Sequence, residues 1–419
     1  MVISSFLTLL LIGLPIALVL AISALVYIFV SGQTVLLQSY SQQLFSGMES
    51  YGLLAVPLFM LAGELMNEGG ITKRLVDFAS VFMGRVRGGL AYINLIVNMM
   101  MASIIGSAAA QIAVMSRAMV PEMEKQGYDK SLAAATTAAG GLLSPIIPPS
   151  MLFVIYGVLA QIAIGDMFIA GIIPGIMMAF GFFIALAVIG YFNELPVSKP
   201  QSRGDKINSL KLGLPTLVIP LVIVGGILAG LATPTESAAI ASVAAFLLGK
   251  FLYKELKLAR MPEVLYRTAI NASVVVFIVA TAKVFGWIII YEQVPQTLAE
   301  YLVTLTQNPF VFLLIVNIAL LFVGMILDGI AALILVVPIL LPIAQSQYGI
   351  DPFHFGVVVC INLVLGLLTP PVGAGLFITT AMTGVKPGEL FRSLLPFLAT
   401  TVVVLILLSW QPWLVTALL

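Results

Sequence analysis

The chain has 419 residues, of which 61% are hydrophobic and 9% charged, and its formal net charge is +1. With a mean hydropathy of +1.15, this composition excludes a water-soluble domain and a disordered chain, and the charge gives no indication of nucleic-acid binding. The single cysteine, Cys360, lies in an apolar run, which argues against disulfide or redox chemistry. The sequence therefore predicts an all-α polytopic membrane protein.

Apolar stretches of spanning length predict about nine membrane crossings, with two further pairs of segments too short to cross. The first run, 2–30, has no Lys or Arg before it and no small-residue cleavage site after it, so we expect a retained span and not a signal peptide. Residues 1–51 are predicted to form this scaffold span and a connector. In chain order there follow a span at 52–67, an amphipathic segment at 71–83 expected along the membrane surface, a hairpin at 89–121, a broken span at 129–162 and a span at 166–192.

The order of elements then recurs after a link. Residues 193–262 are predicted to hold a loop and two scaffold spans, at 211–230 and 236–253. The second series consists of a span at 263–291, an amphipathic stretch at 296–306, a hairpin at 309–342, a broken span at 353–384 and a last span at 388–410.

Basic residues divide the connecting segments into two classes, and basic segments are expected to be cytoplasmic. Both ends of hairpin 89–121 then lie on the cytoplasmic side, so we predict a re-entrant hairpin with its tip at 103–107. The second hairpin has charge-free flanks and should enter from outside. The basic positions are Lys73, Arg74, Arg85, Arg87, Arg117, Lys125, Lys130, Lys199, Arg203, Lys206, Lys211, Lys250, Lys254, Lys257, Arg260, Arg267, Lys386 and Arg392, whereas 31–50, 163–166, 231–236, 292–308 and 343–352 contain neither Lys nor Arg.

Double prolines interrupt two apolar segments, at Pro148-Pro149 and Pro370-Pro371. Proline has no backbone N–H and clashes with the preceding turn, so each segment should unwind and leave peptide groups without helical partners. Hydrocarbon does not satisfy such groups, whereas a bound ion and an anionic solute do. The alternative is that the prolines only kink packed spans.

The chain also repeats itself at an offset of 221 to 223 residues. This offset pairs Leu75 with Leu298, Ser107 with Asp328, Pro121 with Pro342, Pro148-Pro149 with Pro370-Pro371, and Pro174 with Pro396. Five crossings separate the starts of the copies, 52–192 and 263–419, so the copies should be inverted in the membrane. Inverted repeats with broken helices and re-entrant hairpins are typical of secondary transporters, and kinks alone do not account for the shared offset.

Several motifs resemble the large membrane subunit of TRAP transporters, within the broader ion-transporter superfamily, over nearly the whole chain. They are 11–17 (LIGLPIA), 106–110 (GSAAA), 127–130 (GYDK), 145–150 (PIIPPS), 232–239 (ATPTESAA), Asp328 before an apolar arm, and 367–373 (LLTPPVG). The resemblance implies sodium-coupled import of an organic acid anion across a bacterial inner membrane by an elevator motion, with Na⁺ as coupling ion and no cofactor. It implies two partners, a small four-span subunit, here expected as a separate chain, and a periplasmic binding protein. Gln111 departs from the pattern, since many relatives carry an acidic residue there.

Two sodium cages are predicted from hydroxyls and freed carbonyls, because Na⁺ prefers oxygen ligands. The first comprises Ser103, Gly106, Ser107, Gly141, Ser144 and Pro145, and the second Gly324, Asp328, Gly366, Thr369 and Pro370. A membrane carboxylate such as Asp328 is costly unless a cation pairs with it. The solute's carboxylate is expected at half-helix N-termini, near Ser107, Pro149, Ser150, Asp328, Pro371 and Gly373. Each hydroxyl is as readily explained by back-bonding within its own helix.

Three other polar residues have open interpretations. Lys283 lies inside a span and has three possible roles: it binds an anionic solute, pairs with Glu64 or lies at a subunit interface. Pairing and the interface are favoured. Glu236 suits the first turn of a helix better than a transport role. His354 suits an interfacial position better than a proton relay.

Rival functions are weaker. A membrane enzyme is disfavoured because the sequence has no cluster of His, Asp and Glu with the spacing of metal ligands. An ion channel is disfavoured because a pore favours polar or charged rings over inverted broken helices. The main alternative is a sodium and anion symporter of the same superfamily, of dicarboxylate or gluconate type, that works without a binding protein. The sequence does not identify the solute.

Overall fold

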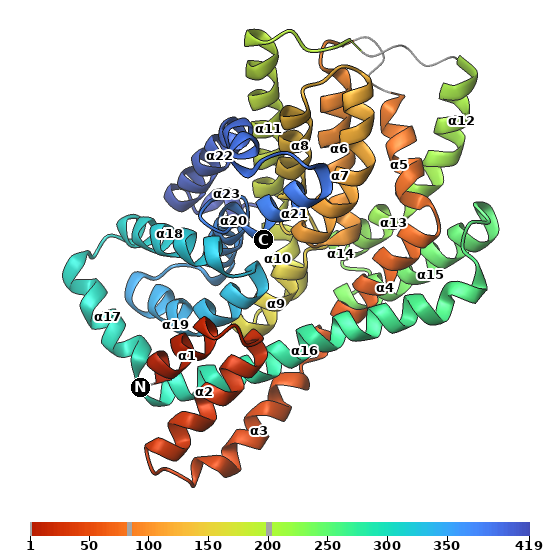
Figure 1. Ribbon diagram of the computed structural model, residues 1–419. Helices are drawn as coiled ribbons and strands as arrows, with labels where there is room; N and C mark the ends of the chain where they lie inside the picture. The colour runs from red at the N-terminus through yellow and green to blue at the C-terminus, as the bar shows by residue number, and fades with distance from the viewer. Residues whose placement is uncertain (1, 82–85, 198–202) are drawn as a thin grey trace.

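The structure is a computed structural model that describes residues 2–81, 86–197 and 203–419 (Figure 1). These residues form helices and no strand. Within this described part of the chain, seven helices are long and apolar enough to cross a membrane, and an eighth is obtained if residues 36–68, bent by 51°, count as one span. Arg85 and Lys199, two of the basic residues used to predict orientation, lie outside the described residues.

The N-terminal region differs from the prediction. Residues 2–30 form two helices, α1 (Val2–Leu11) and α2 (Ile16–Val30), that pack against each other, so the single span is wrong. The chain turns at Gly13, where φ is +85°, and Pro15 fixes the entry to α2. Much of the expected connector is also helical. It contains α3 (Leu36–Met48), which packs along α16 (Met261–Tyr291).

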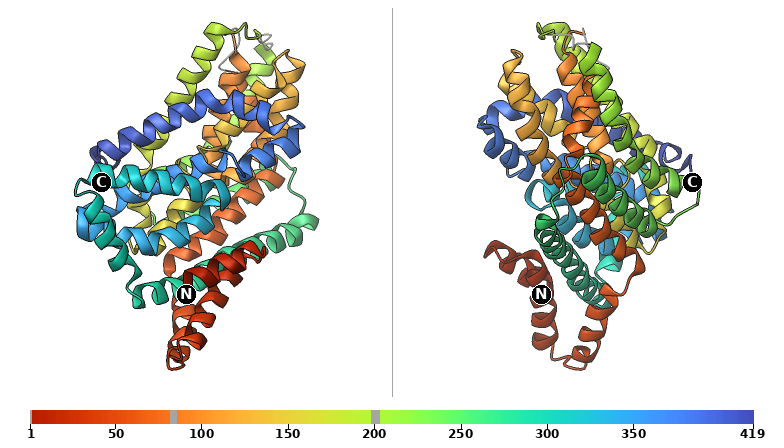
Figure 2. Two further views of the ribbon diagram at one scale, coloured as in Figure 1. Left: turned by 60° about the vertical axis from the view of Figure 1, so that its left-hand side comes forward. Right: turned by 90° about the vertical axis from the view of Figure 1, so that its right-hand side faces the viewer.

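Four helices, α3, α4 (Ala55–Glu68), α15 (Pro234–Leu247) and α16, form what we call the frame. Ser242 in α15 donates a hydrogen bond to the Leu58 carbonyl at 2.9 Å. Arg260 forms an ion pair with Glu68 at 3.0 Å, which ties the start of α16 to α4. In Figures 1 and 2, α1, α2 and α3 lie at one end of the molecule, away from the upright helices at the other.

The frame is extended by shorter elements. Helix α5 (Ile71–Ser80) buries Ile71 and Leu75 and contacts α6 (Gly89–Ile105) and α12 (Arg203–Gly213). The predicted span at 211–230 is a continuous run of α, 3₁₀ and π turns: α12 (Arg203–Gly213), η2 (Leu214–Leu217), α13 (Val218–Pro220), η3 (Leu221–Gly225) and α14 (Gly226–Leu228). The remaining short elements are η1 (Tyr51–Leu54), η4 (Leu248–Leu252) and η5 (Leu258–Arg260).

The first copy of the repeat contains the predicted hairpin and break. Its helices are α6 (Gly89–Ile105), α7 (Ala108–Lys125), α8 (Lys130–Gly141), α9 (Met151–Ala160), α10 (Ile164–Ala170) and α11 (Ile172–Phe192). The hairpin turns at Gly106 and Ser107, and the chain is unwound between α8 and α9, around Pro148-Pro149. The hairpin turn and the unwound segment both occur where the sequence predicts them.

The second copy has the same order of elements. Its helices are α17 (Val294–Leu305), α18 (Pro309–Ile326), α19 (Gly329–Tyr348), α20 (Pro352–Leu367), α21 (Ala374–Thr383), α22 (Pro387–Trp410) and α23 (Trp413–Thr416). Helices α18 and α19 have 18 and 20 residues, so the expectation that this pair is too short to cross is wrong. Helix α19 is longer than predicted because it continues through Pro338 and Pro342.

The two copies interlock reciprocally. Helix α9 of the first copy packs on α19 of the second, and α21 of the second packs on α7 of the first. The second half of each broken segment thus contacts the second arm of the other copy's hairpin, as a pseudo-two-fold relation requires. At the centre, Gly356 leaves room for the ring of Tyr156, whose hydroxyl donates to the Pro352 carbonyl. The inverted orientation and the re-entrant path stay predictions.

Candidate functional site

Both hairpin turns meet at a small cavity of about 50 Å³, which we call the tip cavity. Four predicted site residues line it: Gly106 and Ser107 from the first turn, Pro145 from the first break, and Asp328 from the second turn. The rest of its wall is Ala108, Ala109, Met151, Leu152, Gly329, Ile330, Leu363, Val364 and Leu367. Residues more than two hundred positions apart therefore line one cavity, as the repeat predicts.

The first hairpin turn is bonded to the first break. Gly106 has φ of +63°, and its carbonyl accepts a hydrogen bond from the Met151 amide at 3.3 Å. A Cβ at Gly106 would lie 3.2 Å from the Pro149 carbonyl oxygen, so only glycine suits this approach. Ser107 begins α7 in an extended conformation, and its hydroxyl makes no cap bond. The hydroxyl is therefore available at the start of a helix.

The second hairpin repeats this arrangement. The Gly373 amide donates to the Met325 carbonyl at 2.9 Å, just before the second turn. Asp328 caps α19 by accepting from the Ile330 amide at 3.2 Å, and it is exposed. A backbone hydrogen bond thus ties each broken segment to its own hairpin, and the donors Met151 and Gly373 are separated by the repeat offset. The Asp328 carboxylate keeps further acceptor capacity toward the tip cavity.

Three predicted hydroxyls have different environments. Ser144 Oγ is fully buried and has no hydrogen-bond partner. Ser150 caps α9, since its hydroxyl accepts from the Phe153 amide at 3.2 Å and donates to the Pro145 carbonyl. Thr369, two residues after the end of α20, donates to the Leu365 carbonyl in the last turn of that helix at 2.8 Å. The hydroxyl protons of Ser150 and Thr369 are therefore already used, whereas Ser144 has unmet hydrogen-bonding capacity.

The remaining predicted residues lie outside the lining of the tip cavity. Ser103 is buried in the last turn of α6. Three glycines serve close packing: Gly141 against Ile112, and Gly324 against Gly366. The others outside the lining are Ser144, Pro149, Ser150, Thr369, Pro370, Pro371 and Gly373, of which Pro370 and Pro371 are exposed.

Sequence reasoning missed two buried amide networks. In the first copy, Gln111 donates to the carbonyl and side-chain oxygens of Asn98, at 2.8 and 2.9 Å, and Asn94 donates to Thr137 at 2.7 Å. In the second copy, Asn362 donates to the corresponding oxygens of Asn317 at 2.8 and 3.0 Å. The signal was present, because Asn98 and Asn317 are separated by nearly the repeat offset. At Gln111, where a charge was in doubt, a neutral amide donates to this network, and its own Oε1 atom is buried without a hydrogen-bond partner.

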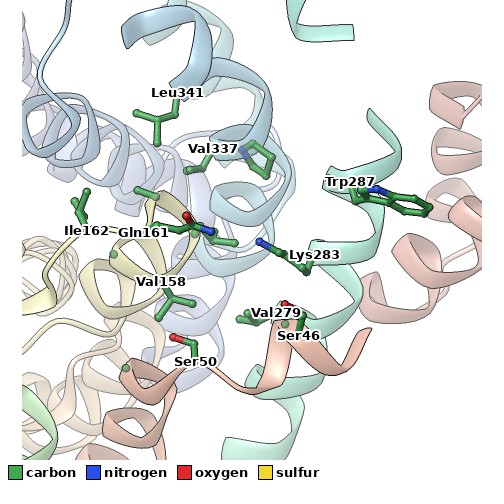
Figure 3. Close-up of a pocket in the computed structure, with 18 of the residues that line it drawn as sticks. Ser46, Ser50, Val158, Gln161, Ile162, Val279, Lys283, Trp287, Val337 and Leu341 are labelled. Carbon is green, nitrogen blue, oxygen red and sulfur yellow. The ribbon is translucent and has the colours of Figure 1, made fainter. Parts of the chain in front are cut away.

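Two larger cavities flank the tip cavity, each between the frame and a hairpin. One, of about 390 Å³, lies between α4 and α16 on one side and the first hairpin on the other, and it reaches Ser107. The other, of about 690 Å³, lies between α3 and α16 on one side and α9 and α19 on the other (Figure 3).

The three polar residues with open interpretations are resolved in part. The pairing of Lys283 with Glu64 is wrong, because Glu64 lies 3.9 Å from Arg267, sixteen positions earlier on α16, and Lys283 faces the cavity in Figure 3. Glu236 forms a capping box with Thr233, which confirms a structural position. His354 is buried in the protein, with its Nε2 atom 2.8 Å from the Leu408 carbonyl oxygen, and its position at the membrane interface stays a prediction.

Comparison with known proteins is consistent across sequence and fold. Residues 3–414 match the family described as "Tripartite ATP-independent periplasmic transporter, DctM component". The chain is 38% identical to the sialic acid TRAP transporter large permease protein SiaM of Vibrio cholerae, over 96% of this chain and 93% of that protein. It is 36% identical to the C4-dicarboxylate TRAP transporter large permease protein DctM of Pseudomonas aeruginosa, over 90% of this chain and 88% of that protein.

A solved structure shows the same architecture at low sequence identity. The Alcanivorax borkumensis YdaH transporter superposes with a TM-score of 0.67 at 14% identity, covering 91% of this chain and 89% of that one. This likeness concerns the fold alone, and it supports the membrane-transporter architecture. The family match and the large-permease relatives together show that the chain belongs to the DctM component family, the large permease subunits of TRAP transporters.

Proposed function

We propose that this permease carries an organic acid anion into a bacterial cell, across the inner membrane, coupled to Na⁺. The observation that carries the proposal is the convergence of both hairpin turns on the tip cavity, with Asp328 as the one ionisable side chain in its described lining. Asp328 is exposed in the structure and accepts from the Ile330 amide, so its carboxylate keeps acceptor capacity for a cation, and a bound cation would offset the cost of placing this carboxylate within the membrane.

Sodium binds at the junctions between each hairpin and its broken segment. In the second copy the ligands are the Asp328 carboxylate and the backbone of 366–370. In the first copy they are the break around Pro145 and the hydroxyl of Ser144. Support for Ser144 comes from its burial without a partner, since a buried hydroxyl normally has a hydrogen bond and a cation supplies the missing interaction.

The anion binds at the N-termini of α7 and α19. Ser107 and Asp328 are the N-caps of these helices and line the tip cavity, and the positive end of a helix dipole favours negative charge. In this proposal Pro149, Ser150, Pro371 and Gly373 shape the site through backbone, because the Ser150 hydroxyl is used as a cap. Relatives are named for sialic acid and C4-dicarboxylates, which are carboxylates, and for isethionate, which is a sulfonate, so we propose that the solute is an organic acid anion.

Transport is an elevator motion of the two hairpins and two broken segments against the frame. The cavities of about 390 and 690 Å³ both lie at the boundary between these parts, which is where a moving block requires loose packing. The reciprocal contacts of α9 with α19 and of α21 with α7 hold the block together.

Two partners complete the transporter: a small permease subunit and a periplasmic binding protein. The support is that relatives are named large permease proteins of TRAP transporters, whose family is described as periplasmic. The binding protein selects the solute and delivers it.

Reconstitution in liposomes tests the proposal. The large subunit alone, the two membrane subunits, and both with loaded binding protein are compared for uptake of labelled sialic acid and succinate, with and without an inward Na⁺ gradient. Uptake only in the complete system and only with Na⁺ is expected. Sodium-driven uptake by the lone chain would instead support the binding-protein-independent symporter, and uptake indifferent to Na⁺ would overturn the coupling.

A further inference from the structure

The cavity that Lys283 faces is distinct from the tip cavity. Its volume is about 690 Å³, and none of the residues that line the tip cavity lines it. Its walls come from α3 and α16 of the frame and from the end of α9 and the middle of α19 (Figure 3). This volume lies in the range of small-molecule sites in proteins.

Lys283 is the one charged residue in its described lining. It is half-buried on α16, and in Figure 3 its ammonium group points across the cavity toward Gln161 at the end of α9. Among the described residues, no carboxylate lies within ion-pair distance of it. Glu64 pairs with Arg267, and Glu292, near the end of α16, accepts from Tyr27. A positive charge in a partly dehydrated cavity without a counter-charge favours an anion.

The other lining residues suit a small organic anion. Gln43, Ser46, Ser50 and Gln161 provide hydrogen-bonding groups, and the apolar wall includes Trp287 and Leu341. A ligand with a carboxylate for Lys283, hydroxyl or amide groups for the polar side chains, and a carbon body for the apolar wall matches this distribution. An inorganic ion has no carbon body and would therefore make no apolar contact with this wall.

The cavity lies at the end of the molecule that faces away from the basic segments. It is bordered by the 49–52 connection, the turn after α9 and the last turns of α16, and the adjoining connecting segments 31–50, 163–166 and 292–308 contain no Lys or Arg. By the positive-inside rule this is the extracytoplasmic side. Lys283 is therefore a cation at the end where solute arrives.

We propose that Lys283 forms an anion-docking site in this cavity, which holds the carboxylate of the solute on the entry side before it reaches the tip cavity. The site is formed jointly by the frame and the moving block, so its shape changes during transport. This inference rests on the proposed function for the identity of the anion, whereas anion binding at Lys283 is testable by itself.

Trp287 provides a local probe, because it lines the same cavity one turn beyond Lys283 and the only other tryptophans are Trp410 and Trp413. In the full-length chain in liposomes, with Trp410→Phe and Trp413→Phe, Trp287 fluorescence is quenched with iodide and, separately, with neutral acrylamide. Lys283→Gln should lower the iodide quenching constant about twofold or more and leave acrylamide quenching unchanged, because removing the charge lowers the local anion concentration. Lys283→Arg should restore iodide quenching, and Lys257→Gln, an exposed lysine outside the cavity, should have no effect.

Competition identifies the ligand class. In the protein that retains Lys283, succinate should lower the quenching of Trp287 fluorescence by iodide, whereas neutral succinamide should not. Equal iodide quenching in Lys283→Gln and the parent, or no quenching by either agent, would overturn the docking site. Because sodium-driven uptake by the complete system is measured separately, a failed quenching result in an active transporter contradicts this inference alone. Failed uptake with intact quenching contradicts only the proposed function.

Discussion

The carbonyl carbon of Gly324 lies 2.5 Å from the position that a Cβ on Gly366 would occupy. Helices α18 and α20 therefore meet backbone against backbone, directly beside the second turn and the second break. Neither residue has a flexible atom that could move aside, because both contacting groups are main chain. This close approach fixes the position of Asp328 relative to the unwound segment that follows Gly366.

Gly366→Ala should destabilise the protein and abolish uptake. The added methyl group would overpack a backbone contact, which typically costs about 1–3 kcal/mol. Thermal unfolding of the purified protein in detergent measures the change. Gly388→Ala is the matched control, since no atom lies within 4 Å of its Cβ position in the first turn of α22, and it should leave stability and uptake intact.

Ser144→Ala and Ser150→Ala should have opposite effects. Ser150 caps α9, so its loss should cost about 1 kcal/mol of unfolding free energy with little change in the Na⁺ dependence of uptake. Ser144 has no hydrogen-bond partner, so its loss should leave stability unchanged or raised. If Ser144 binds Na⁺, half-maximal uptake should then need at least severalfold more Na⁺. An unchanged Na⁺ dependence in Ser144→Ala would remove it from the first cage.

Asp328→Asn separates the charge from the helix cap. Asparagine caps a helix about as well as aspartate, so stability should be retained while the Na⁺ requirement for uptake rises strongly. Asp351→Asn is the control, because Asp351 caps α20 through the Phe353 and His354 amides at 2.8 and 3.0 Å and lies outside the tip cavity lining. Equal Na⁺ responses in the two variants would argue against Asp328 as a ligand.

A disulfide between frame and block should stop transport. A Cβ at Gly286 on α16 would lie 3.2 Å from Cβ of Pro338 on α19, close to the separation of about 3.5–4.5 Å found in disulfides. Gly286→Cys with Pro338→Cys, in a Cys360→Ala background that removes the single native cysteine, gives a defined pair. Oxidation should abolish uptake and reduction should restore it. Each single-cysteine variant should be unaffected by oxidant; full uptake by the cross-linked protein would contradict the elevator motion.

The breaks were predictable because local chemistry determines them. Proline removes a backbone donor at Pro148-Pro149 and Pro370-Pro371, and glycine permits the positive φ at Gly106, so unwound segments and a hairpin turn follow from single residues. The convergence of Ser107 and Asp328 on one cavity was predictable from the repeat. The turn at Gly13 was missed because an apolar run with one Gly and one Pro also fits a kinked span.

Tertiary contacts were less predictable. Lys283 and Arg267 both lie on α16, and sequence does not give the point at which α4 crosses that helix, so the partner of Glu64 was assigned to the wrong residue. The role of Ser150 as a cap and the lack of a partner for Ser144 depend on the path of the unwound chain, which no periodicity describes. The pairing within the amide networks was not predictable because each network joins side chains on different helices, and the sequence does not show which helix faces face each other.

Helix α9 of the first copy packs on α19 of the second, and α21 of the second packs on α7 of the first, so the two copies must assemble together. Each copy covers the other's apolar surfaces, so neither is an independent folding unit, although the sequence duplicates itself. A ribosome that has completed the first copy has produced a segment whose contacts are still to be synthesised. The duplicated halves are thus mutually dependent, and the packing of the first copy is completed only after the second copy has been synthesised.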